Sequence, residues 1–185
     1  MAKGYHFPNL SLVGIIDADA GLMGGDIRAT ERIYNLLQQV SGRAGRAKQS
    51  GEVFIQTYYP NQPAIQSLKN RNRKKFIEQS LLEREQFNVP PFSFMTAIII
   101  SGASKASVES YSINLAKALI PEDQISVLGP VEAPLFLLRG KYRYRLLLKG
   151  NNRRVLNSFT RNLIKICPTP PNLRLTIDVD PYTFV

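Results

Sequence analysis

The sequence predicts an α/β unit followed by an α+β domain, and three observations support this. Near the start, two short apolar runs flank one amphipathic helix, which is the strand–helix–strand pattern of a parallel crossover. Beyond residue 91, strand and helix patterns alternate in the order βαββαβ. Between the two parts, Val89-Pro90-Pro91 ends a helical stretch, because proline lacks an amide hydrogen and disfavours helical angles in the preceding residue.

The first part contains two predicted strands and one helix, over residues 10–16, 52–58 and 29–40. The helix is predicted because apolar residues recur at helical spacing: Ile33, Leu36, Leu37 and Val40. Asp17 and Asp19 follow the first strand. They either form a carboxylate pair or end the strand at a nucleotide-facing loop, since ligands bind at the carboxyl ends of parallel strands.

The middle stretch, Pro63 to Asn88, is polar and charged, and its periodicity predicts two helices. It contains the basic patch Lys69-Asn70-Arg71-Asn72-Arg73-Lys74-Lys75. Two interpretations stay open. The patch contacts a DNA backbone, or it is the solvated start of a helix, where charge runs usually lie.

The second part has four predicted strands and two helices, and Ser104 is the expected cap of the first helix. The strands span 92–101, 125–131, 141–149 and 173–179, and the helices span 104–119 and 153–166. A loop at Arg139-Gly140 precedes the third strand. The order βαββαβ predicts a ferredoxin-like domain, in which both helices cover one face of the sheet and leave the other open.

The charge is strongly positive and unevenly distributed. The 185 residues contain 24 Lys and Arg against 14 Asp and Glu, a net charge of +10. Residues 1–60 carry only +1, and residues 61–185 carry +9. This excess favours an anionic partner such as nucleic acid. Cys167 and His6 are the sole residues of their types, so we expect no disulfide and no metal site. With no membrane-spanning run or signal peptide in the sequence, we expect a soluble cytoplasmic protein.

The predicted strand at 141–149 concentrates basic residues on one side. Since side chains alternate along a strand, one face carries Lys141, Arg143, Arg145 and Lys149. Tyr142 and Tyr144 lie on the other face. We predict that the basic face binds nucleic-acid phosphates, as an alternative to merely covering the sheet with long stems. The tyrosines are either core residues or platforms for stacked bases.

The run Gln39-Val40-Ser41-Gly42-Arg43-Ala44-Gly45-Arg46 follows the first predicted helix. Its glycines allow unusual backbone angles and a close approach to another group. The guanidinium groups of Arg43 and Arg46 stay charged and grip phosphate oxygens in a fixed geometry. The alternative is a helix end with two solvated arginines.

The flanking segments are Lys3-Gly4-Tyr5-His6-Phe7-Pro8-Asn9-Leu10-Ser11-Leu12-Val13 and Gly51-Glu52-Val53-Phe54-Ile55-Gln56-Thr57. Together with the arginine run, these segments resemble the last two motifs, V and VI, of superfamily 2 helicases. Several further stretches resemble the replication-restart helicases of that superfamily: Asp26-Ile27-Arg28-Ala29-Thr30-Glu31-Arg32, Val89-Pro90-Pro91-Phe92, Leu128-Gly129-Pro130 and Asp178-Val179-Asp180-Pro181. The resemblance covers the chain from Lys3 to about Tyr182.

The resemblance implies an ATP-driven helicase that unwinds DNA 3′ to 5′ and restarts replication at stalled forks by primosome assembly. It implies that Arg43 contacts the γ-phosphate and that Arg46 is the arginine finger, within an ATP-binding element that also includes Gln39 and Gly42. It further implies that Lys3 and Gly4, in motif V, couple the nucleotide state to the DNA strand.

No phosphate-binding loop or paired acidic magnesium motif occurs in the sequence, so we expect a fragment that is inactive alone. ATP, Mg²⁺ and zinc are expected as cofactors of the parent protein only. The expected parts are the end of a RecA-like second motor lobe over 1–62, a helical linker over 63–90 and the C-terminal domain over 91–185. The expected partners are forked or single-stranded DNA, primosome proteins and the single-stranded-DNA-binding protein. In one departure, tyrosines stand at Tyr142 and Tyr144 where the family leads us to expect tryptophans.

Two other classes of function stay open. The chain is alternatively a non-enzymatic nucleic-acid-binding module, or a scaffold whose open sheet face binds a protein partner. Salt dependence separates these two, because phosphate contacts weaken steeply as salt rises.

Overall fold

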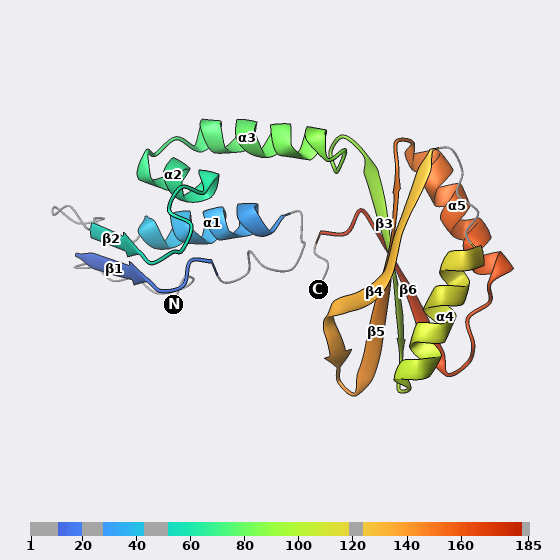
Figure 1. Ribbon diagram of the computed structural model, residues 1–185. Coiled ribbons are helices and arrows are strands. Elements are labelled where there is room, and N and C mark those ends of the chain that lie inside the picture. Colours follow the sequence, from blue (N-terminus) through green and yellow to red (C-terminus); the bar gives the residue numbers. More distant parts are fainter. Residues whose placement is uncertain (1–10, 20–27, 43–51, 119–123, 183–185) are drawn as a thin grey trace. The chain divides into compact units, whose positions relative to one another are not determined.

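A computed structural model of the protein describes residues 11–19, 28–42, 52–118 and 124–182. Its internal contacts divide the chain into two compact units, residues 1–82 and 83–185 (Figure 1). The predicted three-part organisation with boundaries at residues 62 and 90 remains a prediction.

The first unit is built on a parallel strand pair, as the strand–helix–strand pattern predicts. Strand β1 (Leu12–Ile15) pairs with β2 (Glu52–Ile55), and helix α1 (Ala29–Ser41) lies between them in the sequence. Both strands are shorter than predicted. The reason is Asp17, whose φ of 53° turns the chain out of the extended conformation directly after β1, so β2 has no regular partner beyond Ile55.

Helices α2 (Pro63–Lys69) and α3 (Arg73–Gln86) confirm the two helices predicted after Pro63. Pro63 opens α2, where its missing amide hydrogen costs nothing. The aromatic rings of Tyr34 in α1 and Phe76 in α3 stack, with 4.2 Å between their centroids. A neighbouring cluster joins the helices to the strand pair: Ala18, Ile33, Leu37 and Ile65, with Ile15, Ile55 and Leu68 at its edge.

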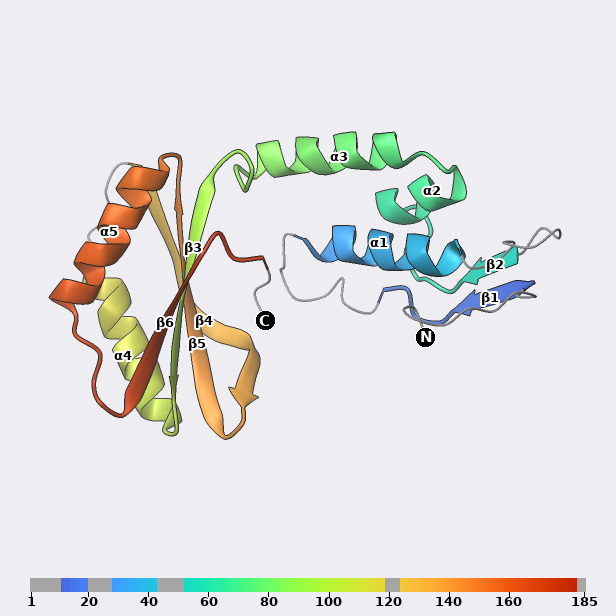
Figure 2. The same cartoon turned by 180° about the vertical axis from the view of Figure 1, so that it is seen from behind.

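The second unit has the predicted order βαββαβ and is an α+β domain. Its elements are β3 (Phe94–Gly102), α4 (Lys105–Ala118), β4 (Ile125–Leu138), β5 (Lys141–Gly150), α5 (Arg153–Ile166) and β6 (Leu173–Val179). The four strands form one sheet in the order β4-β5-β3-β6, and every neighbouring pair is antiparallel. Figures 1 and 2 show that α4 and α5 lie on the same side of this sheet.

The core of this unit lies between the helices and the sheet. Every second residue of β5 points into it, which explains the alternating burial along that strand. The most deeply buried members are Ile98, Ile100, Val108, Leu115, Leu146, Leu148 and Leu156. Both helices begin at a polar cap. The Ser104 hydroxyl accepts a hydrogen bond from the Ser107 amide at 3.3 Å, and the Asn152 side chain accepts from Arg154 and Val155.

Strand β4 is longer than predicted, because it continues past Val131 to Leu138. The predicted strand ended at Val131, and the structure has a shift in strand register just before that residue, between Leu128 and Val131. A second shift follows between Glu132 and Leu137. Bulges of this kind break the regular pairing without ending a strand, so β4 continues beyond its predicted end.

Replacing Gly129 by alanine should destabilise the second unit. Its φ of +99° belongs to the left-handed region, and an added Cβ would lie 2.8 Å from the Arg145 carbonyl oxygen. The expected loss combines about 1–2 kcal/mol for the backbone conformation with about 1–3 kcal/mol for overpacking. The measurement is thermal unfolding of the wild-type and substituted chains.

Gly140→Ala is the matched control, because its φ is +74° and nothing lies within 4 Å of the added Cβ. It should cost only the backbone part, about 1–2 kcal/mol. Equal losses at the two positions would contradict the packing explanation.

Candidate nucleic-acid interface

The predicted basic residues of β5 share one face of the sheet, opposite to the helices. Arg143, Arg145 and Lys149 are half-buried and Lys141 is exposed, whereas the even-numbered residues from Tyr142 to Leu148 face the core. Long Lys and Arg stems on such a face commonly cover the sheet while the charged ends reach toward solvent. The four side chains thus have the arrangement that phosphate binding would need, although the binding itself stays a prediction.

Arg174 of β6 belongs to the same face and was missed at the level of sequence. Arg143 pairs with Ser101 of β3, and Ser101 pairs on its other side with Arg174. Two strand spacings separate the arginines, roughly 10 Å. The missed signal was topological: in the order βαββαβ, β6 pairs with β3, so alternate residues of β6 extend the face. We call Lys141, Arg143, Arg145, Lys149 and Arg174 the basic face.

The centre of this face is apolar. Ile99 and Val131 flank Arg145 on the neighbouring strands, and Leu147 pairs with Leu128. Leu128 and Val131 are 48% and 50% exposed. The acidic Asp178 also lies on this side, beside Ala97. The cations therefore surround an apolar strip, and such a surface can contact both the phosphates and the bases of an unpaired strand.

The two tyrosines of β5 lie on the other side, against the helices. Tyr144 is buried in the core, and Tyr142 packs at its edge beside Phe136, with 5.4 Å between ring centroids. Burial raises the pKa of the Tyr144 hydroxyl, and the nearby Glu109 and Glu132 raise it further. Of the two predicted roles, the structure supports core packing, because stacked bases would have to displace the helices.

Helix α1 carries the beginning of the arginine run. Gln39 is exposed in its last turn, and the Gly42 amide donates to the Gln38 carbonyl at 2.9 Å. Gly42 has a φ of −69°, which any residue can adopt. An added Cβ would lie 3.2 Å from the Gln38 oxygen, so a larger residue here would have to displace that carbonyl slightly. Lys3, Gly4, Arg43 and Arg46 lie outside the described residues, and their roles stay predictions.

Asp17 and Asp19 do not act as a pair. Asp17 is exposed, whereas the Asp19 carboxylate is buried and joins the ends of the two strands of the first unit. It accepts hydrogen bonds from the Thr57 hydroxyl at 2.6 Å and from the Tyr58 amide at 2.7 Å. Asp19 is thus a structural residue at the carboxyl end of β1.

The basic patch at residues 69–75 includes the start of α3. The Asn72 side chain accepts a hydrogen bond from the Lys75 amide, and Lys74 lies 3.8 Å from Glu78, one turn further along. These contacts agree with a solvated helix start. Contact with DNA by this patch remains untested.

Among the described residues, no group of three or more His, Cys, Asp and Glu side chains could hold a metal ion. Within the same part of the chain, every helix is too short or too polar to cross a membrane.

The fold and the charge pattern define the second unit as an α+β domain with a basic sheet face that neither of its helices covers. Sequence comparison gives the family: residues 85–182 match the family described as Primosomal protein N C-terminal domain. The chain belongs to this family.

The chain is also similar to proteins named Replication restart protein PriA. The relative from Rickettsia conorii is 38% identical over 184 residues, which cover 100% of this chain and 28% of the relative. Those from Haemophilus influenzae and Bacillus subtilis are 36% and 32% identical, and the matches cover 98% of this chain and 25% and 23% of the relatives. The resemblance noted in the sequence is confirmed, and the chain spans about a quarter of the length of these relatives.

Proposed function

We propose that this chain is part of an ATP-dependent DNA helicase that restarts replication, and that its second unit binds single-stranded nucleic acid through the basic face. The observation that carries the binding proposal is the gathering of five cations from β5 and β6 on the side of the sheet opposite to the helices. Family membership and the names of the relatives support the role in replication restart.

The first unit, in this proposal, is the end of a RecA-like motor lobe, and the second is a ferredoxin-like domain. The parallel pair β1-β2 joined through α1 supports the first assignment, and the strand order β4-β5-β3-β6 supports the second. Arg43 and Arg46 contact ATP and Mg²⁺-bound phosphates held by the remainder of the helicase. Forked or single-stranded DNA, primosome proteins and the single-stranded-DNA-binding protein are the proposed partners, and the cytoplasm is the proposed location.

Salt dependence tests the binding proposal. If each of the five cations contacts one phosphate of a single strand, log Kobs should fall against log salt with a slope of about −0.7 × 5, or −3.5. Arg143→Ala combined with Arg145→Ala removes two contacts, so the slope should flatten by about 1.4. The measurement is fluorescence anisotropy with an oligothymidylate at several salt concentrations.

Arg161→Ala combined with Lys165→Ala is the matched control. These exposed residues of α5 carry the same charge but lie on the helical side of the domain, so the slope should stay unchanged. An equal flattening in both double variants would mean that net charge, rather than this face, is responsible for binding.

The apolar strip favours one second candidate, a scaffold that binds a protein partner. Leu128 and Val131 are about half exposed on β4, which is an edge strand of the sheet, and edge strands and exposed apolar residues commonly form interfaces. The salt concentration would then have little influence on the affinity for this partner. Val131→Glu would abolish partner binding, whereas Arg143→Ala would not.

A further inference from the structure

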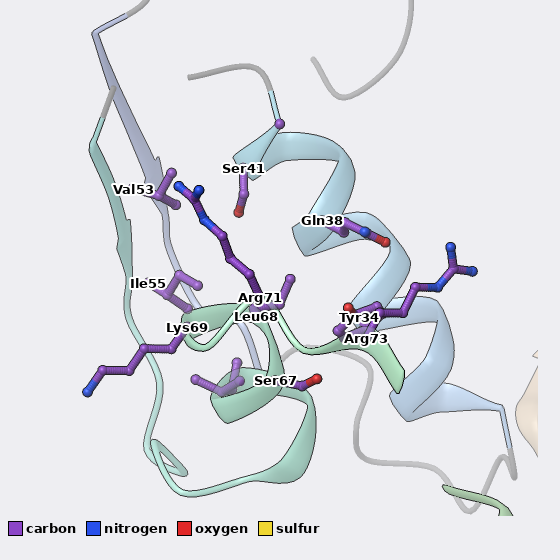
Figure 3. Close-up of a pocket in the computed structure, with 12 residues that line it drawn as sticks. Tyr34, Gln38, Ser41, Val53, Ile55, Ser67, Leu68, Lys69, Arg71 and Arg73 are labelled. Atoms are coloured by element: carbon purple, nitrogen blue, oxygen red, sulfur yellow. The ribbon is translucent and has the colours of Figure 1, made fainter. Parts of the chain in front are cut away.

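The first unit contains a groove that none of the roles above uses. It lies between α1, β2 and the end of α2, and its volume is about 800 Å³ (Figure 3). This volume is within the range of small-molecule sites, about 300–1,000 Å³. Val53, Ile55 and Leu68 supply apolar surface, and Gln38 and Ser41 supply polar side chains from α1.

The charged residues along this groove are all cations. Lys69, Arg71 and Arg73 line it, and none of the described residues that do so is acidic. In Figure 3 the Arg71 side chain is directed into the groove, toward the end bounded by Val53 and Ser41. The charged ends of Lys69 and Arg73 point outward. One guanidinium thus enters the groove, and no described residue gives it an ion pair or a hydrogen bond.

The backbone at Arg71 is unusual for an arginine. Its φ of 51° lies in the left-handed region, and its amide closes the end of α2 by donating to the Leu68 carbonyl at 3.1 Å. Asparagine adopts this conformation more readily than arginine, and asparagines stand on both sides, at positions 70 and 72. The left-handed backbone conformation therefore does not favour arginine at position 71. The direction of its side chain into the groove gives a reason for an arginine at this position.

We propose that this groove binds a nucleotide, with its phosphate on the Arg71 guanidinium and its base against Val53, Ile55 and Leu68. A guanidinium binds phosphate through two parallel hydrogen bonds, and the Ser41 hydroxyl, which lies beside the Arg71 side chain in Figure 3, adds a donor. The apolar surface suits the face of a base. The choice of a nucleotide over another phosphate ester rests on the proposed function. The site itself uses neither Arg43 and Arg46 nor the basic face.

A structural role for Arg71 gives a different expectation. The last turn of α1 has no basic residue, so a guanidinium near Ser41 would also balance the partial negative charge of the helix end. If that were its whole role, Arg71→Ala would lower the melting temperature and leave ligand binding unchanged. The test therefore measures both properties.

The test is isothermal titration of the full chain carrying Arg143→Ala and Arg145→Ala, so that the basic face contributes little. Thymidine monophosphate and an oligothymidylate are the two probes, and they separate a free nucleotide from a nucleotide within a strand. Arg71→Ala should weaken the binding of at least one probe about tenfold, as expected for a lost hydrogen bond to a charged group. Arg71→Lys should restore only part of it, since an ammonium lacks the planar fork.

Arg73→Ala is the matched control, with the same charge loss two residues away and its charged end outside the groove. It should change binding by less than about twofold, because its charged end lies away from the proposed phosphate position. The proposal is overturned if Arg71→Ala and Arg73→Ala weaken binding equally, if Arg71→Ala only lowers the melting temperature, or if neither probe binds. None of these results bears on the salt slope of the basic face, so the two proposals fail separately.

Discussion

If the full-length protein is the proposed ATP-dependent helicase with Arg46 as its arginine finger, Arg46→Ala should abolish DNA unwinding and lower DNA-stimulated ATP hydrolysis by about 10³–10⁵-fold. An arginine finger acts on the charge that develops as the phosphoryl group leaves, so its loss raises the barrier more than it weakens ATP binding. A ground-state contact to a charged group is worth only about 1.5–3 kcal/mol. Steady-state hydrolysis and ATP affinity, measured together, distinguish the two effects.

Arg46→Lys is the control for this experiment and should rescue little, because the ammonium keeps the charge without the fork of donors. DNA affinity should persist in both variants. The 185-residue chain alone should show no turnover, since its sequence has no phosphate-binding loop. If the Arg46→Ala variant hydrolysed ATP at a rate within a few fold of wild type, the arginine run would instead be a helix end with solvated arginines.

Leu146→Ala should destabilise the second unit by about 2–5 kcal/mol, the usual cost of truncating a buried leucine. Leu146 is fully buried at the centre of the sheet, where it pairs with the equally buried Ile98 and faces the helices. Hydrogen exchange of the amides of β3 and β5 measures the loss, because these strands are the centre of the sheet.

Leu128→Ala provides the comparison on the opposite face. Its side chain is about half exposed, so truncation should cost less than about 1 kcal/mol, which is typical of surface positions. A similar loss of protection in both variants would contradict the assignment of the two faces, on which the nucleic-acid proposal also depends.

The sequence predicted the second unit well where the signals were local. Helix α5 was predicted with its exact bounds, because its apolar residues recur at helical spacing. The alternation of basic and core-facing residues along β5 was equally clear from the sequence. Strand β4 was predicted to end at Val131, and only the pairing with β5 shows that it continues to Leu138 beyond the two register shifts.

The candidate sites depended more on contacts between distant residues. Arg174 joins the basic face only because β6 pairs with β3, a fact of topology. Asp19 was expected either in a carboxylate pair or at a nucleotide-facing loop after the first strand, and the structure shows that it accepts hydrogen bonds from Thr57 and Tyr58, 38 and 39 residues later. Arg71 belonged to a charge run without distinction until its side chain was seen to enter the groove. Periodicity cannot reveal which of several neighbouring cations points inward.

The pairing of β3 with β6 has a consequence for how this domain sits in a polypeptide. Thr96 lies opposite Val179, and the Asp180 amide donates to the Met95 carbonyl at 2.8 Å, so the chain enters and leaves the sheet at the same place. Arg153 reinforces this point through an ion pair of 2.7 Å with Asp180. A domain with adjacent ends tolerates circular permutation. Joining residue 182 to residue 90 through a short linker, and opening the chain at the Arg139-Gly140 turn, should therefore give a permuted domain with the same sheet.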